Sequence, residues 1–389
     1  MEQRPNTNRH LTLLGAAHSF NHSLFVIAPP LLALIMSDLG VSKFTISTVA
    51  TVASFVYGLG ALAGGPLGDR IGESRTIILS LAFSGLSTFI MILAGATTSI
   101  YVYALALILM AIWASLYHPT ANSLISKTFQ GKVAESMGLH GVGGTLGVVL
   151  TPTIAYTIGV TLGWSYSFVA FGLLCIILAF VFAKEFGKDD RTSNAHGSIL
   201  AAFRMRELWA LLIFNVAIGL FMKGVELFTP IYLKESRMVD PWWASAAYTL
   251  VLAAGVPGQW IGGKASDLIG SKKVLIATMA GICISLISLL FIPSYTIGIG
   301  LFIILYGVAF YAHQPALNSL TGFLSPKKQR GAVYGIFFFT SFGIGSLSQV
   351  MAGYLADAYS LDASFYLLTV FALIALLLSF KLPDKREDR

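Results

Sequence analysis

The chain has 389 residues, of which 56% are hydrophobic and only 11% are charged. A soluble domain is about 45–50% apolar and about 25% charged, so this composition excludes a water-soluble enzyme and predicts a protein embedded in a lipid bilayer. The formal charge of +7 does not require a nucleic-acid partner, because almost all of the basic residues lie in short connections between apolar segments.

Twelve apolar segments follow one another along the chain. A helix that crosses about 30 Å of hydrocarbon needs about 20 apolar residues, which each of these segments supplies. We expect the spans at residues 11–36, 44–68, 76–96, 100–126, 133–160, 164–183, 208–233, 242–263, 273–293, 296–322, 331–356 and 362–381. The first lacks a small-residue cleavage site and is interpreted as a retained helix. Cys175 and Cys283 lie in apolar segments, which indicates neither a disulfide framework nor a metal site.

The distribution of Lys and Arg predicts the orientation. Of the 25 basic residues, 21 lie in the N-terminus, the C-terminus and every second connection. Positive charge marks the cytoplasmic side of a membrane protein, so both termini are expected in the cytoplasm. The expected location is the inner membrane of the cell. The polar stretch 184–207 is predicted to be a cytoplasmic linker between two six-helix bundles, residues 1–183 and 208–389.

The two halves share an internal repeat. Residues 65–75 return 198 positions later as residues 263–273, with Gly, Asp, Gly and a terminal base in register. Two further sets repeat at shifts of 196 and 201: His118-Pro119 with Gln314-Pro315, and Phe20, His22 and Pro29 with Phe221, Lys223 and Pro230. Two halves in parallel repeat are typical of transporters whose substrate site lies near the midplane between the halves.

Residues 65–75 resemble the loop signature of the major facilitator superfamily, with Ser74 at the first basic position. The resemblance implies an all-α membrane protein of twelve transmembrane helices in two pseudo-symmetric six-helix bundles, acting as a monomer without a cofactor. It also implies a gating role for the loop residues Gly65, Asp69, Arg70 and Arg75, and for the repeated Asp267.

The fifth span resembles the antiporter signature of the drug-efflux branches. Its matching residues are Gly138, Gly147 and Pro152, while Thr151 replaces the usual glycine before the proline. The run Tyr117-His118-Pro119, followed by residues 138–144, is most similar to the fosmidomycin-resistance-like branch. The many glycines of this span are expected to let helix backbones approach closely.

Two full charges lie deep within one span, Lys223 and Glu226. A charge at the bilayer centre costs about 2.5–3.5 kcal/mol on insertion scales, so such residues are functional candidates. Their i, i+3 spacing places them on one helix face. We expect Lys223 to bind an anionic substrate group and Glu226 to carry a proton; the alternative is a locked ion pair with a purely structural role.

Five of the seven histidines also fall within spans: His18, His22, His118, His140 and His313. Histidine titrates near neutral pH, which suits proton coupling. By the repeat, His22 corresponds to Lys223, so it is expected in the same cavity together with the neighbouring Asn21. For His18 and His140 a role as interhelical hydrogen-bonders is favoured. Metal transport is disfavoured, because no carboxylate or Cys accompanies the histidines at a ligand spacing on one helix.

These observations favour a proton-coupled secondary transporter that exports a small anionic or amphipathic molecule by alternating access. The first alternative is an uptake symporter for an organic anion with the same fold, and the remote alternative is a non-transporting membrane receptor. No phosphate-binding loop or catalytic constellation indicates an enzyme or an ATP-driven pump.

Overall fold

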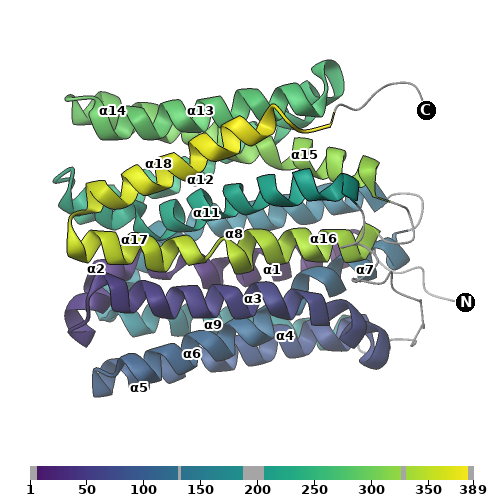
Figure 1. The fold of residues 1–389 in the computed structure, drawn as a ribbon. Helices are drawn as coiled ribbons and strands as arrows, with labels where there is room; N and C mark the ends of the chain where they lie inside the picture. Colours follow the sequence, from purple (N-terminus) through teal and green to yellow (C-terminus); the bar gives the residue numbers. More distant parts are fainter. Residues whose placement is uncertain (1–6, 130–132, 187–205, 326–329, 384–389) are drawn as a thin grey trace, which may run out of the picture. The chain divides into compact units, whose positions relative to one another are not determined.

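The computed structural model describes residues 7–129, 133–186, 206–325 and 330–383, and in these residues it consists of helices without strands (Figure 1). The predicted linker at 184–207 lies outside them except at its ends. The chain divides into two compact units, Met1–Val41 with Val52–Ala195, and Ser42–Thr51 with His196–Arg389.

The first unit is built from six helical rods, three of which are interrupted. Its helices are α1 (Thr7–Val26), α2 (Ala28–Leu39), α3 (Lys43–Ile71), α4 (Glu73–Ser87), α5 (Ile90–Thr97), α6 (Ile100–Ala114), α7 (Tyr117–Thr128), α8 (Val133–Leu162) and α9 (Trp164–Phe186). The interrupted rods are α1–α2, α4–α5 and α6–α7. The α6–α7 break precedes Pro119, which has no N–H to donate to the carbonyl of Ser115 and therefore weakens the helix at this point.

The second unit also contains six rods among the described residues. Its helices are α11 (Arg206–Glu235), α12 (Pro241–Ile269), α13 (Ser271–Phe291), α14 (Tyr295–Leu301), η1 (Phe302–Tyr306), α15 (Gly307–Leu324), α16 (Arg330–Phe338), η3 (Phe339–Ile344), α17 (Leu347–Ala358) and α18 (Leu361–Ser379). Two rods contain a π-helical turn, η1 or η3. Pro315 lies within α15, and the helix is not broken there.

Eleven of the described rods are long and apolar enough to cross a membrane. The remaining rod, α12, has 29 residues but carries the polar residues Gln259, Lys264 and Asp267. The six rods of each unit correspond to the twelve expected spans.

The repeat reappears in the backbone at Gly72 and Gly270, which are 198 residues apart. Gly72 separates α3 from α4 with φ 99° and ψ 138°, and Gly270 separates α12 from α13 with φ 92° and ψ 143°. A side chain is strained at such positive φ values, so glycine is required at both junctions. The corresponding loop is therefore a single residue in each unit.

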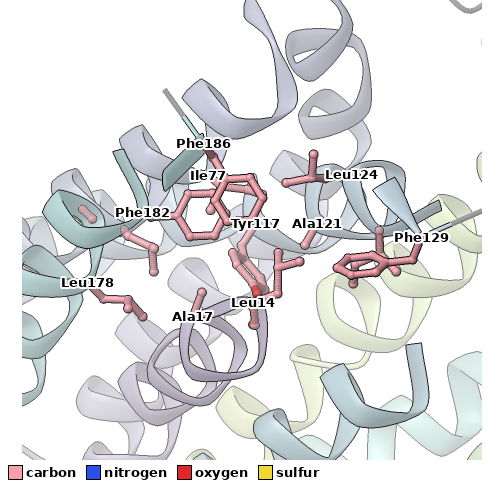
Figure 2. Packing of buried hydrophobic residues seen from close by; sticks show 13 residues of the cluster. Leu14, Ala17, Ile77, Tyr117, Ala121, Leu124, Phe129, Leu178, Phe182 and Phe186 are labelled. Atoms are coloured by element: carbon pink, nitrogen blue, oxygen red, sulfur yellow. The ribbon is translucent and has the colours of Figure 1, made fainter. Parts of the chain in front are cut away.

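A buried apolar cluster fills one part of the first unit, with members from α1, α4, α7 and α9 (Figure 2). Tyr117 is fully buried in it and donates a hydrogen bond of 2.9 Å from its hydroxyl to the carbonyl of Leu14. Because lipid tails are as apolar as such a cluster, its contribution in a bilayer comes from close packing rather than from transfer out of water.

The N-terminal end of α3, up to Thr51, belongs to the second unit, and a side chain of α17 caps it. Asp357 accepts hydrogen bonds from the backbone N–H groups of Phe44, at 2.7 Å, and Lys43, at 3.2 Å. The Nζ of Lys43 lies 3.0 Å from a carboxylate oxygen of Glu235 at the end of α11. A carboxylate at a helix N-terminus satisfies free N–H groups and interacts favourably with the helix dipole.

Candidate functional site

Four histidines gather in the first unit from three different helices: His18 and His22 of α1, His118 of α7 and His140 of α8. The ring of His18 stacks on that of His140, with centroids 4.1 Å apart and planes at 9°. It is nearly perpendicular to the rings of His22, at 4.5 Å, and His118, at 5.0 Å. The rings of His22 and His118 are also 5.0 Å apart and perpendicular.

Hydrogen bonds fix the orientation of two of these rings. The Nδ1 of His18 lies 2.7 Å from the carbonyl oxygen of His140 and must donate to it, because a carbonyl only accepts. Tyr117 donates its hydroxyl proton to Leu14, so the Nε2–H of His140, 3.0 Å away, donates to the hydroxyl oxygen. His18 and His140 are thus interhelical hydrogen-bonders, as favoured from the sequence.

The glycines of α8 make room for this arrangement. A Cβ built on Gly144 would lie 2.6 Å from Nδ1 of His18. On Gly143 it would lie 2.6 Å from Cα of Gly15, and on Gly147 it would lie 2.6 Å from the carbonyl carbon of Ser19. Small residues at these three positions therefore allow α1 and α8 to pack backbone against backbone.

The close-packing interpretation is wrong for two other glycines of the same helix. A Cβ on Gly138 or Gly141 would meet no atom within 4 Å among the described residues, because both lie on a face of α8 turned away from α1. At the end of the antiporter-like signature, Pro152 lies inside α8. The hydroxyl of Thr151 lies 2.6 Å from the carbonyl of Gly147 and 2.8 Å from Oγ of Ser23, so it links α8 to α1.

Asn21 does not join the histidine cluster. It is fully buried, and its side-chain amide donates a 3.1 Å hydrogen bond to the carbonyl of Ala114. That carbonyl belongs to the last residue of α6, where the helix leaves carbonyls without an intrahelical partner. Asn21 is therefore placed to stabilise the interruption between α6 and α7.

In the second unit, Lys223 and Glu226 form a direct ion pair on α11. The Nζ of Lys223 lies 2.6 Å from Oε2 of Glu226, and the two side chains are 6% and 25% exposed. The same Nζ lies 4.1 Å above the ring centre of Phe342. Lys223 is thus held by a carboxylate and by the face of an aromatic ring, both favourable for an ammonium group.

Phe342 belongs to the π-helical turn η3, and such turns are frequent at functional sites. Asn215 of α11 supports this turn, since its amide donates hydrogen bonds of 2.7 Å to the carbonyl of Phe337 and 2.8 Å to Oγ1 of Thr340. The widened turn and the asparagine together place Phe342 over the ammonium group.

His313 belongs to the second unit. It is 4% exposed in α15, where its Nδ1 donates to the carbonyl of Phe310 one turn earlier. In the structure it is a locally satisfied histidine.

The residues for which a gating role was expected lie within helices, at or near their ends, and not in a loop as the sequence suggested. Asp69 and Arg70 fall in the last turn of α3, and Arg75 falls in the first turn of α4, because only Gly72 interrupts the helices. Gly65 also lies inside α3, and Asp267 is exposed near the end of α12. The side chain of Asp69 lies outside the described part of the structure; Arg70 and Arg75 are exposed.

A buried acid that the sequence pattern did not indicate, Glu73, lies next to this junction. Its side chain is 5% exposed and forms an ion pair with Lys127 of α7. Ser123 donates a further hydrogen bond to the same carboxylate oxygen at 2.8 Å. The available signal was an acidic residue in the first turn of α4, where the helix dipole favours it.

The described helices are long and apolar enough for a multi-pass membrane protein, and comparison with known proteins identifies a transporter rather than an enzyme. Residues 11–349 match the Major Facilitator Superfamily, so the chain belongs to this superfamily. The probable sulfoacetate transporter SauU of Cupriavidus necator is 26% identical over 440 aligned residues, covering 99% of this chain and 98% of the relative.

Two further comparisons agree with this assignment. The fosmidomycin resistance protein of Escherichia coli (strain K12) is 21% identical over 389 aligned residues, which cover 96% of this chain and 93% of that protein. The crystal structure of a mutant of the nucleoside transporter NupG shares the fold, with a TM-score of 0.81 at 14% identity over 96% of this chain and 98% of that one. The predicted family and all-α fold are confirmed.

Proposed function

We propose that this protein couples the movement of a small organic anion to that of a proton, with Lys223 binding the anion and Glu226 carrying the proton. The observation that carries the proposal is the direct, 2.6 Å contact between these two charges within a membrane-spanning helix. Charges are costly at this depth and are typical of substrate and proton pathways. The sulfoacetate named for SauU carries the kind of anionic groups that an ammonium binds.

The contact also favours a particular coupling. An anionic substrate and the Glu226 carboxylate compete for one ammonium group, so an anion that binds Lys223 displaces Glu226. The displaced carboxylate then lacks its counter-charge in a low-dielectric interior, which favours its protonation. Anion and proton are therefore bound together, and Phe342 keeps the ammonium in place during the exchange.

Joint binding supports symport, the uptake alternative, when the proton gradient is directed inward. The export prediction is supported by a different observation, the similarity to a fosmidomycin resistance protein over almost the whole chain. The two candidates share the anion and proton sites on α11 but predict opposite directions of proton flow. In both, alternating access carries the substrate across the membrane.

The experiment uses purified protein in liposomes with a pH-sensitive dye inside. Sulfoacetate, methylphosphonate and a lipophilic cation are added outside in turn to wild type, Glu226→Gln and the control Glu185→Gln, which changes an acid at the end of α9. Symport predicts that an anion acidifies the lumen of wild-type and control liposomes but not of Glu226→Gln liposomes. Alkalinisation would support proton exchange and export instead.

Two results would overturn the proposal. Proton movement with lipophilic cations alone would exclude Lys223 as the substrate anchor. Uptake of a radiolabelled anion without any proton movement would exclude proton coupling through Glu226.

We also propose that both termini lie in the cytoplasm, on the strength of the 21 basic residues in the termini and every second connection. A fluorescent-protein fusion at the C-terminus should fluoresce, and an alkaline phosphatase fusion there should be inactive. The reverse pattern would invert the topology.

A further inference from the structure

We propose that His18, His22 and His118 form a binding site for one divalent transition-metal ion of the zinc, nickel or copper type. Each residue offers one ring nitrogen, and these three atoms all lie within 4.8 Å of one another. The ligands come from two helices, because His18 and His22 are one turn apart on α1 and His118 is at the start of α7. This is why the spacing along one helix did not indicate the site.

The distances are compatible with a metal after a small adjustment. Zinc–imidazole bonds are about 2.0–2.1 Å long, so nitrogens around a tetrahedral ion are roughly 3.4 Å apart. From 4.8 Å, each ring has to move by about an ångström toward the centre. The rings of His18, His22 and His118 are nearly perpendicular in each pair, so no ring stacks over another in the group.

The hydrogen bonding of His18 provides an independent observation that points to a cation. Its Nδ1–H is donated to the carbonyl of His140, so in the neutral ring Nε2 carries a free lone pair. That Nε2 atom is buried and has no hydrogen-bond partner among the described residues. A histidine that donates one ring N–H to a backbone carbonyl and leaves the other nitrogen free is the usual arrangement of a metal ligand.

The ring orientation is itself held in place by neighbours. The stacked His140 ring lies 4.1 Å from His18 and is fixed in turn by Tyr117, while Gly144 leaves the space that the His18 ring occupies. Such supporting contacts orient metal ligands and raise affinity. Because the ligands are three neutral imidazoles, they suit Zn²⁺, Ni²⁺ or Cu²⁺ rather than Mg²⁺ or Ca²⁺. Three protein ligands leave a coordination position for water or a small anion.

This site is distinct from the proposed anion and proton residues. Lys223 and Glu226 lie on α11 in the second unit, and none of the three histidines contributes to their contact. The metal-binding proposal can therefore be tested independently of the proposal of proton coupling.

The full-length protein is purified without a histidine tag and stripped of metal with a chelator. It is then titrated with Zn²⁺ alone, followed by calorimetry, and in a separate experiment with Co²⁺ alone, followed by absorption. Wild type is compared with the ligand variants His22→Asn and His118→Gln and with the control His313→Asn. Glutamine is chosen at position 118 because the equivalent position of the repeat, 314, has glutamine. We expect one equivalent bound by wild type and control, and an affinity at least about tenfold weaker in both ligand variants.

Three outcomes would overturn the proposal: no binding below millimolar Zn²⁺, equal binding by wild type and both ligand variants, or an equal loss in the control. If a ligand variant does not fold, Cu²⁺ electron paramagnetic resonance of the wild type decides, since three coordinated imidazole nitrogens support the site and fewer than three exclude it.

Discussion

Replacing Gly143 with alanine tests the close approach of α1 and α8 on which the histidine cluster depends. The added Cβ would lie 2.6 Å from Cα of Gly15, whereas ordinary van der Waals contact begins at 3.4 Å, so α1 must move by at least 0.8 Å. The clash is with backbone and cannot be relieved by rotating a side chain. Overpacking of this kind costs about 1–3 kcal/mol.

Gly141→Ala, two residues earlier on the same helix, is the matched control. A Cβ there meets nothing within 4 Å among the described residues. Both variants gain up to about 1 kcal/mol of helix propensity, so the difference between them isolates the packing cost. Apparent melting temperatures in detergent, read by size-exclusion chromatography after heating, should be lower for Gly143→Ala than for Gly141→Ala. Equal melting temperatures would refute the close-packing account.

Three further predictions follow from buried groups and strained backbone. Lys127→Met should destabilise the protein by about 3–5 kcal/mol, because it leaves the Glu73 carboxylate buried without its partner. The double variant with Glu73→Gln should recover most of the loss in melting temperature. Gly270→Ala should lower the free energy of unfolding by about 1–2 kcal/mol because of its φ of 92° alone, since the added Cβ would meet no described atom within 4 Å. An unchanged melting temperature in the same assay would contradict this. Gly144→Ala should displace the His18 ring and weaken Zn²⁺ binding about 10–100-fold while leaving the protein folded, and unchanged affinity would show that the ring orientation is irrelevant.

Hydropathy and the internal repeat predict most of the fold. Apolar length alone locates the spans, and the 198-residue repeat anticipates the equivalent junctions at Gly72 and Gly270. The sequence did not reveal that these junctions are single residues, because Asp69 and Arg70 read as loop residues by polarity. Their charge is compatible with the last helical turn at the end of a span.

The candidate sites were predictable only where they are local in sequence. The pairing of Lys223 with Glu226 follows from their spacing on one helix. The meeting of His18 with His118 and His140 depends on how three helices pack, which no periodicity encodes. Likewise, Phe342 meets Lys223, and Asn215 bonds to the carbonyl of Phe337, only because two helices far apart in the sequence pack together.

Coupling of the anion to Glu226 can be measured as the number of protons taken up when the anion binds. Sulfoacetate is added to detergent-purified protein in weakly buffered solution, and the pH change is measured with an indicator alongside calorimetric binding. The account predicts that wild type takes up a proton as it binds the anion, that Glu226→Gln binds without proton uptake, and that Lys223→Gln does not bind. Anion binding with no proton uptake in wild type, or with the same uptake in Glu226→Gln, would contradict it.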